Sequence, residues 1–357
     1  MKINSKIKNY SVEMIDNLLE RKDKIFSSLR YRRLFYLVDE NFFSIYEKKI
    51  KEFIGEDFFY VIPATEQNKS YFKLADYYRV LVGNNFMRSD ILVTFGGGIL
   101  QDISGFIAST LYRGIKWIFF PTTLLAQADS CIGSKTSINF EDSKNLIGTF
   151  YPPDFIYIDS GFCRTLTEDY FNSGLGEIIK FHLMSDSKGY TLLKEYLSSS
   201  DLRDEGLLKK IILLTLGIKR SYFESDEFDS GRRNLLNYGH CFGHALESAS
   251  NFKVCHGEAV IVGMGFANLL SLKRGIITKE KYDEFERIFR KHYPRFDLST
   301  ISVDALIGYL KRDKKRIGQD LTMILCEDIG KQIKADDIKE SEIKDTFKEF
   351  AAKYKEN

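Results

Sequence analysis

Three of the chain's five histidines lie between residues 240 and 256. His240 and His244, in the string GHCFGHALE, are four positions apart, so one helical turn would present both imidazoles on the same face. His256 follows in CHGEAV, at the start of the next expected helix. Two imidazoles and a carboxylate around an open coordination position suit a catalytic Zn²⁺. The cluster therefore predicts a metal site.

The carboxylate that would complete this site is not fixed by spacing. Glu177, Glu247 and Glu258 are all candidates. Glu177, in GLGEIIKFH, shares a helix face with Lys180, which in most proteins would mark only a surface ion pair. Its other neighbours are mainly apolar, so we expect this stretch to be partly buried. A buried carboxylate needs a partner, and a metal ion would serve.

Cationic and amide side chains recur in apolar or glycine-bearing segments. Any one of them alone would ordinarily be a solvated surface group. Gathered near the histidines, they would form a pocket for phosphate and carboxylate groups, but spacing alone cannot show that they gather. These residues are Lys135, Lys144, Asn145, Lys219, Arg233, Asn237 and Lys314.

Three consecutive glycines, Gly96 to Gly98, follow the apolar run ILVTF and precede an expected helix. Glycines let the backbone approach a phosphate closely, and a helix N-terminus offers free N–H groups and the positive end of its dipole. The string is not the GxGxxG fingerprint. It therefore indicates either a phosphate-binding turn or a tight strand-to-helix turn without a ligand.

The elements that would position these residues differ between the two halves of the chain. In the first half, segments such as 41–54 are long enough for helices and separate short apolar runs. Buried strands alternating with helices indicate a parallel sheet covered on both faces. The predicted strands are residues 34–38, 58–62, 91–95, 115–120 and 155–158.

From about Thr167 the apolar residues recur near helical spacing, at 207–222, 258–274 and 279–290. This pattern predicts a helical second domain, with the boundary near residues 160–170. We expect domains at 1–165 and 166–357, and the cleft between two domains is the usual place for chemistry.

Composition excludes several classes of protein. Lys and Arg number 52 against 50 Asp and Glu, so no strong positive field would recruit nucleic acid. No window is apolar for the roughly 18 residues that a membrane helix needs, and the first twenty residues lack a signal-peptide core. Five cysteines without a CxxC pair indicate free thiols in a reducing cytoplasm. We therefore expect a cytoplasmic protein with neither nucleic-acid nor membrane partners.

Seven blocks of the sequence resemble, in the same order, those of the 3-dehydroquinate synthase family in the sugar phosphate cyclase superfamily. The resemblance runs from about residue 37 to residue 329. It implies an α/β N-terminal domain with a mainly parallel, Rossmann-like sheet that binds NAD. It also implies an all-α C-terminal domain that binds Zn²⁺ or Co²⁺, and a homodimer. The blocks are GGGILQDISGF, YRGIKWIFFPTTLLAQADSCIGSKTSIN, KNLIGTFYPP, SGLGEIIKFHL, RRNLLNYGHCFGHALE, HGEAVIVGM and RDKKRIG.

The resemblance also implies roles for individual residues. Glu177, His240 and His256 match the metal ligands, which moves His244 to the substrate pocket. Arg113 and Lys144 are additional cations near the phosphate. The remaining substrate contacts implied are Asp129, Lys135, Asn145, Lys180, Lys219, Arg233, Asn237 and Lys314. The cofactor contacts implied are Asp39, Glu66, Lys69, Gly97, Gly98, Asp102, Thr122, Thr123, Lys144 and Thr165.

The activity implied is that of a carbon–oxygen lyase of the shikimate pathway, in aromatic amino acid biosynthesis. Members convert 3-deoxy-D-arabino-heptulosonate 7-phosphate to 3-dehydroquinate and phosphate. In the family, bound NAD oxidises a ring hydroxyl, phosphate is eliminated, the ketone is reduced again, and an intramolecular aldol closes the carbocycle. Zn²⁺ can polarise the oxygen that becomes the carbonyl.

The sequence departs from the family pattern at four positions. Gln101 replaces the glycine usual before the aspartate of the GGG block, and Ser134 replaces a glycine near the expected phosphates. Gly176 stands where alanine is common, and Cys241 where threonine or serine is common. We expect all four to tolerate NAD and metal binding.

Three other functions stay open. The first is another cyclase, such as a 2-deoxy-scyllo-inosose or valiolone-type synthase, against which Lys219, Arg233 and Asn237 favour a carboxylated substrate. The second is an NAD- and metal-dependent polyol or alcohol dehydrogenase, which would not need the polar PTTLLAQADS and SKNLIG blocks. The third is a non-catalytic binding protein derived from the enzyme.

Overall fold

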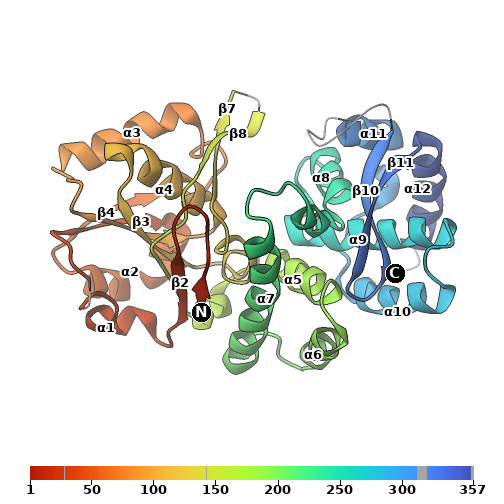
Figure 1. Cartoon of the computed structure of the whole chain (residues 1–357), viewed down its shortest axis with the longest axis horizontal. Helices are drawn as coiled ribbons and strands as arrows, with labels where there is room; N and C mark the ends of the chain where they lie inside the picture. The colour runs from red at the N-terminus through yellow and green to blue at the C-terminus, as the bar shows by residue number, and fades with distance from the viewer. Residues whose placement is uncertain (28, 142, 312–319, 355–357) are drawn as a thin grey trace. The chain divides into compact units, whose positions relative to one another are not determined.

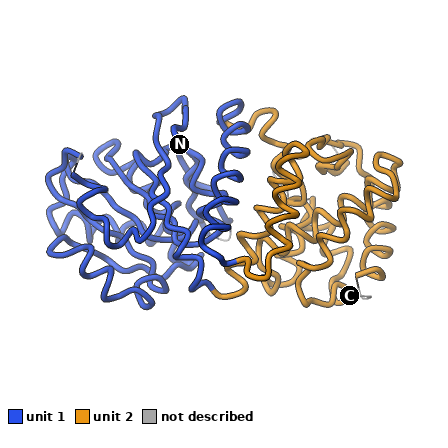
Figure 2. Tube along the Cα trace, turned by 90° about the horizontal axis from the view of Figure 1, so that it is seen from below, with its two compact units in different colours: residues 1–166, 203–227 blue, residues 167–202, 228–357 orange. Residues whose placement is uncertain are grey.

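The computed structural model describes residues 1–27, 29–141, 143–311 and 320–354. The chain folds into two compact units, drawn in different colours in Figure 2. The first contains residues 1–166 and 203–227, and the second contains residues 167–202 and 228–357. The first unit is therefore made of two separate stretches of the chain.

The first unit is built on a seven-stranded sheet, in the order β1-β2-β9-β6-β5-β3-β4. Only β1 and β2 pair antiparallel, and every other neighbouring pair is parallel. The predicted parallel sheet and its five predicted strands are confirmed, while β1 and β2 were not predicted. The strands are β1 (Lys2–Ile3), β2 (Tyr10–Met14), β3 (Leu34–Asp39), β4 (Phe58–Ile62), β5 (Ile91–Gly96), β6 (Lys116–Pro121) and β9 (Phe155–Ile158).

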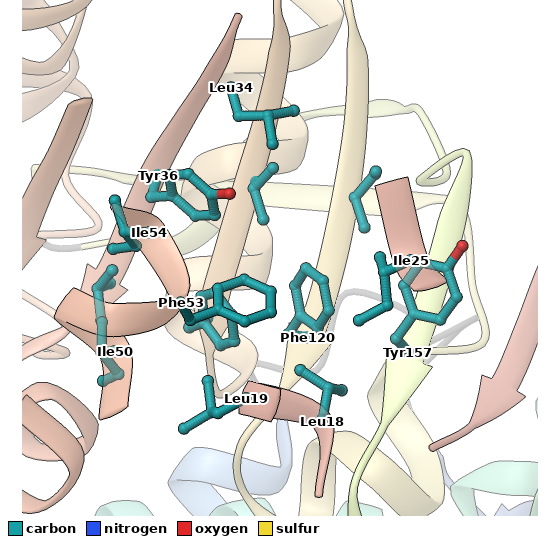
Figure 3. Close-up of a cluster of buried hydrophobic side chains, with 14 of the residues drawn as sticks. Leu18, Leu19, Ile25, Leu34, Tyr36, Ile50, Phe53, Ile54, Phe120 and Tyr157 are labelled. Carbon is teal, nitrogen blue, oxygen red and sulfur yellow. The ribbon is translucent and has the colours of Figure 1, made fainter. Parts of the chain in front are cut away.

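The central strands are apolar on both faces because helices cover both faces (Figure 1). On one face, α1 (Lys22–Phe26) and α2 (Glu40–Ile54) pack an aromatic core, part of which Figure 3 shows. Phe120 stacks on Phe95 with ring centroids 4.5 Å apart, and Phe53 meets Phe120 edge to face. Such pairs contribute roughly 0.5–1.5 kcal/mol each beyond the area they bury.

The opposite face is covered by α4 (Gly98–Thr110), with α3 (Tyr71–Gly83) beside it. Gly105 allows this packing, since a Cβ there would lie 2.7 Å from the Thr136 side chain and 3.3 Å from the Trp117 ring. The remaining described elements of the unit are the hairpin β7 (Lys135–Phe140) and β8 (Ser143–Phe150), a π-helix (Ala126–Ser130), α7 (Glu205–Ser225) and three 3-10 helices (Leu18–Glu20, Leu111–Arg113 and Ser160–Thr165).

The second unit is helical in its described part, as predicted, with one antiparallel hairpin that was not predicted. Its central helix is buried along almost its whole length and contacts the helices on either side of it. None of the described helices in either unit is both long and apolar enough to cross a membrane. The elements are α5 (Glu168–Leu183), α6 (Ser187–Leu197), α8 (His240–Ala249), the central α9 (His256–Lys273), α10 (Lys279–Phe289), α11 (Val303–Lys311), β10 (Leu321–Asp328), β11 (Lys331–Ile338) and α12 (Glu340–Tyr354).

Candidate active site

Three helices of the second unit bring one carboxylate and three imidazoles together. Glu177 of α5 places Oε1 3.2 Å from His240 Nε2 and 3.3 Å from His256 Nε2. His240 and His256 are the first residues of α8 and α9. His244, one turn along α8, has a ligand atom within 4.8 Å of one on each of the other two imidazoles. The three histidines predicted to cluster therefore lie close together in the structure, and the Glu177 carboxylate lies beside two of them.

The approach of α5 to α9 depends on glycine. A Cβ at Gly176 would lie 2.2 Å from the carbonyl oxygen of Gly257, and a Cβ at Gly257 would lie 2.1 Å from that of Ser173. The two backbones thus touch directly beside Glu177 and His256. This contact accounts for Gly176, the position where the resembled family commonly has alanine.

Glu177 is completely buried. Lys180 pairs with its Oε2, and the imidazoles lie near Oε1, but neither oxygen accepts a hydrogen bond of ordinary geometry from the described residues. The Lys180 ammonium offsets Oε2, but Oε1 faces only the two imidazole nitrogens, and a buried oxygen without a hydrogen bond is costly unless a further cation binds it. One carboxylate oxygen and two imidazole nitrogens that converge also form a ligand set suited to Zn²⁺ or Co²⁺. The residues present therefore fit a divalent transition metal.

The outer nitrogens of two imidazoles are oriented by neighbours. His240 Nδ1 lies 3.2 Å from the Tyr238 carbonyl oxygen, so a proton on Nδ1 leaves the Nε2 lone pair directed at Glu177. His256 Nδ1 lies 3.4 Å from Glu247 Oε1. Glu247 thus contacts the outer nitrogen of His256 and not the nitrogen that faces Glu177. Glu258 instead accepts a hydrogen bond from Asn172 at 3.2 Å. Of the three carboxylates that spacing left open, only Glu177 faces both Nε2 atoms.

Burial and charge set the protonation of this cluster. Burial lowers the pKa of His240, and the Lys180 ammonium lowers it further. Burial and the neighbouring imidazoles lower the pKa of His244 to about 3. Burial works against protonation of His256 too, but the adjacent carboxylates of Glu177 and Glu247 raise its pKa to about 10. Burial alone would raise the pKa of Glu177, yet Lys180 and His240 hold it well below its ordinary value.

Other predicted residues of the second unit lie on α5 and just before α8. The Lys180 ammonium is buried against Glu177 and the Phe181 ring, 4.5 Å from the ring centroid. Arg233 and Asn237 lie on a half-buried 3-10 helix, Arg232–Asn237, that leads into α8. Lys314 lies outside the described residues.

In the first unit, several predicted cofactor contacts follow the carboxyl ends of neighbouring parallel strands, which meet at one edge of the sheet. Asp39 ends β3 and caps α2, accepting from the backbone N–H of Asn41 at 2.8 Å. Gly97 and Gly98 follow β5 and begin α4. Thr122 and Thr123 follow β6, and a Cβ at Gly97 would lie 3.1 Å from Thr123 Cγ2. The glycine string therefore lies at a helix N-terminus, where a phosphate can bind.

A polar network connects four of the predicted residues. The buried Lys69 ammonium lies 3.1 Å from Asp102 Oδ2, 2.8 Å from Asn145 Oδ1 and 3.7 Å from Glu66 Oε2. Burial raises the pKa of Asp102, although the Lys69 ammonium opposes the change. Residues from α4, β8 and the segment before α3 thus meet around one cation.

Two further members of this network, Ser137 and Asn139, were not predicted from the sequence. Ser137 donates to Asp102 from its backbone N–H at 2.9 Å and from its hydroxyl at 2.7 Å. Asn139 donates to Glu66 Oε2 at 2.7 Å. Both stand in the string TSIN of β7, two positions apart and therefore on one face of that strand. Period-two polar spacing was the available signal.

A second ion pair joins α7 to the π-helix. Lys219 Nζ lies 2.6 Å from Asp129 Oδ1 and also donates to the Asp129 carbonyl oxygen. Of the other predicted residues in this unit, Lys135 and Lys144 are exposed on the β7–β8 hairpin. The Thr165 hydroxyl lies 3.2 Å from that of Tyr46. Arg113 is exposed in a left-handed conformation, with φ of 61°.

Family models cover most of the chain. The model described as 3-dehydroquinate synthase N-terminal matches residues 59–173, and the model described as 3-dehydroquinate synthase C-terminal matches residues 174–316. The chain is 36% identical to the 3-dehydroquinate synthase of Clostridium botulinum (strain Alaska E43 / Type E3) over 92% of this chain and 95% of that protein.

Solved structures share the fold. ValA, the 2-epi-5-epi-valiolone synthase of Streptomyces hygroscopicus subsp. jinggangensis 5008 with NAD⁺ and Zn²⁺ bound, superposes with a TM-score of 0.86 at 26% identity. The match covers 98% of this chain and 99% of that one. A 2-deoxy-scyllo-inosose synthase complexed with carbaglucose-6-phosphate, NAD⁺ and Co²⁺ superposes with a TM-score of 0.88 at 23% identity, again over 98% and 99% of the two chains. The second likeness concerns the fold alone.

Proposed function

We propose that this chain, which belongs to the 3-dehydroquinate synthase family, is a lyase. It would convert 3-deoxy-D-arabino-heptulosonate 7-phosphate to 3-dehydroquinate and phosphate. The observation that carries the proposal is the convergence of Glu177, His240 and His256. It lies in the part of the chain that the C-terminal family model matches. The enzyme would act in the shikimate pathway.

Glu177, His240 and His256 would hold Zn²⁺ or Co²⁺, and the glycine turn before α4 would hold the pyrophosphate of NAD. When bound, NAD takes up a hydride and returns it, and the metal polarises the oxygen of the carbon that is oxidised. The Tyr238 carbonyl and Glu247 orient the two imidazoles from behind.

The chain's own polar residues would bind and orient the rest of the reactants. The network around Lys69 keeps Asp102 and Asn145 in place, and the ion pair of Lys219 with Asp129 presents a buried ammonium. Arg233 would bind the substrate carboxylate through two hydrogen bonds, and a neutral sugar has no carboxylate to accept them. Asn237, His244, Lys180, Lys135 and Lys314 are proposed as further substrate contacts, and Lys144 as a phosphate or cofactor contact.

We assign the cofactor to the domain predicted at residues 1–165 and the metal to the domain predicted at 166–357. Helix α7 is an exception to this division by residue number. It lies between residues 166 and 357 but belongs to the first compact unit, where its Lys219 pairs with Asp129.

We further propose that the enzyme is a cytoplasmic homodimer. All five cysteines are free thiols, which suits a reducing compartment. Apolar side chains are exposed on α3 and on the β7–β8 hairpin: Phe72 is 65% exposed and Leu146 is 51% exposed. Phe72 also stacks on Phe140 of that hairpin with ring centroids 5.8 Å apart, and a continuous exposed apolar patch supports an interface between subunits. Sedimentation velocity of the metal-loaded protein tests this, and a monomer at micromolar concentration would contradict it.

A cyclase for a neutral sugar phosphate is a second candidate, favoured by the similarity to ValA over nearly the whole chain. Phosphate release with NAD⁺ and Zn²⁺ or Co²⁺ separates the two candidates. The substrates compared are 3-deoxy-D-arabino-heptulosonate 7-phosphate, sedoheptulose 7-phosphate and glucose 6-phosphate. We expect turnover with the first alone, and turnover only with a neutral sugar would overturn the proposed substrate.

A further inference from the structure

Two side chains from two helices hold the end of the π-helix Ala126–Ser130. The start of this helix is anchored by the Gln127 amide, which donates to the carbonyl oxygens of Pro121 at 3.1 Å and Asp159 at 2.8 Å. At its end, Lys219 of α7 holds Asp129, and Gln101 of α4 holds Ser130. The position of Asp129 thus depends on both helices.

Gln101 and Ser130 bind each other reciprocally. Gln101 Nε2 donates to the Ser130 carbonyl oxygen at 2.7 Å, and the Ser130 hydroxyl donates to Gln101 Oε1 at 2.6 Å. These bonds fix the orientation of the amide, because the reverse orientation would set two carbonyl oxygens against each other. The Gln101 side chain is nearly buried, with the residue 8% exposed, so water competes little for these bonds.

The pair lies between two groups of predicted site residues. Gln101 is in the first turn of α4, after Gly98 and directly before Asp102. The Ser130 hydroxyl lies 3.9 Å from the position that a Cβ would take at Gly98. On its other side, Ser130 is bonded in the chain to Asp129, the partner of Lys219. The two hydrogen bonds therefore connect the glycine turn to the Asp129–Lys219 pair.

We propose that Gln101 and Ser130 are positioning residues that hold Asp129 and Lys219 in register with the cofactor-binding turn of α4. The inference rests on the proposed function, in which Asp129 and Lys219 contact the sugar phosphate. A glycine at position 101, usual in the family that the sequence resembles, could form neither bond.

Three variants of the NAD- and metal-loaded enzyme test the proposal: Gln101→Met, which keeps the length but loses both bonds, Ser130→Ala, and the double variant. Gln101→Met should lower kcat/KM for the sugar phosphate about tenfold, and Ser130→Ala, which keeps the carbonyl that accepts from Gln101, about threefold, in both cases mainly through a higher KM. The dissociation constant of NAD⁺, measured by titration, should stay within about threefold because the glycine turn is untouched. The kcat/KM of the double variant should be close to that of the less active single variant, because the two residues act as one unit.

Ser104→Ala is the matched control. Ser104 lies in the same helix with a buried hydroxyl that has no hydrogen-bond partner among the described residues. The control should behave like the wild type, and Ser130→Thr, which keeps the hydroxyl, should recover most of the lost kcat/KM. With an active wild type, two results would overturn the inference. One is that Gln101→Met and Ser130→Ala have the same kcat/KM as Ser104→Ala. The other is that the losses of kcat/KM in the two single variants multiply in the double variant. A wild type that releases phosphate from none of the three sugar phosphates would overturn the proposed function and the inference with it.

Discussion

At the scale of single residues, Glu177 shows most clearly why a cation is needed. Its carboxylate is fully buried, with Lys180 on one oxygen and two imidazole Nε2 atoms near the other. The neutral His240 imidazole, whose Nε2 presents a lone pair to the Glu177 carboxylate, gains nothing from the contact. A metal ion between the three groups turns the same geometry into attraction.

Glu177→Gln should therefore weaken zinc binding strongly. The substitution keeps the shape of the side chain and removes its charge, so we expect zinc affinity to fall by at least about 100-fold, since even residues outside the ligand set change affinity roughly 10–100-fold. It also leaves Lys180 without its buried counter-charge, which costs about 3–5 kcal/mol of stability. Competition with a chelator measures the affinity, and thermal melting measures the stability.

Glu258→Gln is the control for this experiment. Glu258 lies in the first turn of α9, near His256 in sequence, but contacts Asn172 instead of the imidazoles. It should bind zinc as the wild type does. A Glu177→Gln protein with unchanged zinc affinity would show that this carboxylate is not a ligand.

We propose that Arg233 discriminates between carboxylated and neutral substrates. Arg233→Lys keeps the charge but loses the planar fork that binds a carboxylate through two hydrogen bonds. We expect KM for the heptulosonate phosphate to rise about tenfold while kcat changes less. The exposed neighbour Arg232 supplies the control, and Arg232→Lys should leave KM unchanged. Equal KM values for the two variants would contradict the assignment.

At the scale of elements, the contact of α5 with α9 decides where Glu177 and His256 meet. A Cβ at Gly257 would lie 2.1 Å from the Ser173 carbonyl oxygen, and backbone cannot move aside as a flexible side chain can. Gly257→Ala should therefore push the helices apart, lower the free energy of unfolding by about 1–3 kcal/mol and weaken zinc binding.

The matched control is Gly308→Ala in α11, where a Cβ would meet no atom of the described residues within 4 Å. Alanine is the better helix former by up to about 1 kcal/mol, so this variant should melt at the same or a higher temperature. If Gly257→Ala also melted like the wild type with full zinc content, the close helix contact would not be what positions the ligands.

The sequence predicted those elements whose burial is visible in composition. The strands around residues 34–38 and 91–95 are apolar on both faces, and both are confirmed as β3 and β5. Strand β11, with the polar string KQIKADDI, could not be predicted in this way because its pairing with β10 across a turn at Gly330 makes it a strand. The two-residue strand β1 is too short for any periodicity.

The same limit applies to the site. The spacing of His240 and His244 indicated a cluster, but the choice among Glu177, Glu247 and Glu258 depended on how α5 crosses α9. That crossing is tertiary, and its signal in the sequence is only two glycines on two helices, Gly176 and Gly257. The resemblance to a known family supplied the choice that periodicity could not.

At the scale of the whole molecule, the path of the chain is less simple than a division into two consecutive halves. Residues 203–227 belong to the first compact unit, although their helical pattern resembles that of the second. Periodicity shows that one face of a helix is buried but not what covers it. Lys219 forms an ion pair with Asp129, which is 90 positions away in the sequence, and no local sequence pattern predicts such a pair.

As a member of the 3-dehydroquinate synthase family, this chain is expected to eliminate phosphate from a sugar phosphate while its NAD returns to the oxidised form in every turnover. The most direct measurement follows released phosphate and absorbance at the NADH band in one reaction, with 3-deoxy-D-arabino-heptulosonate 7-phosphate and enzyme loaded with NAD⁺ and zinc. We expect many phosphates to be released per enzyme, with no accumulation of NADH. NADH that accumulates in step with substrate consumption, without phosphate release, would contradict it and indicate a dehydrogenase.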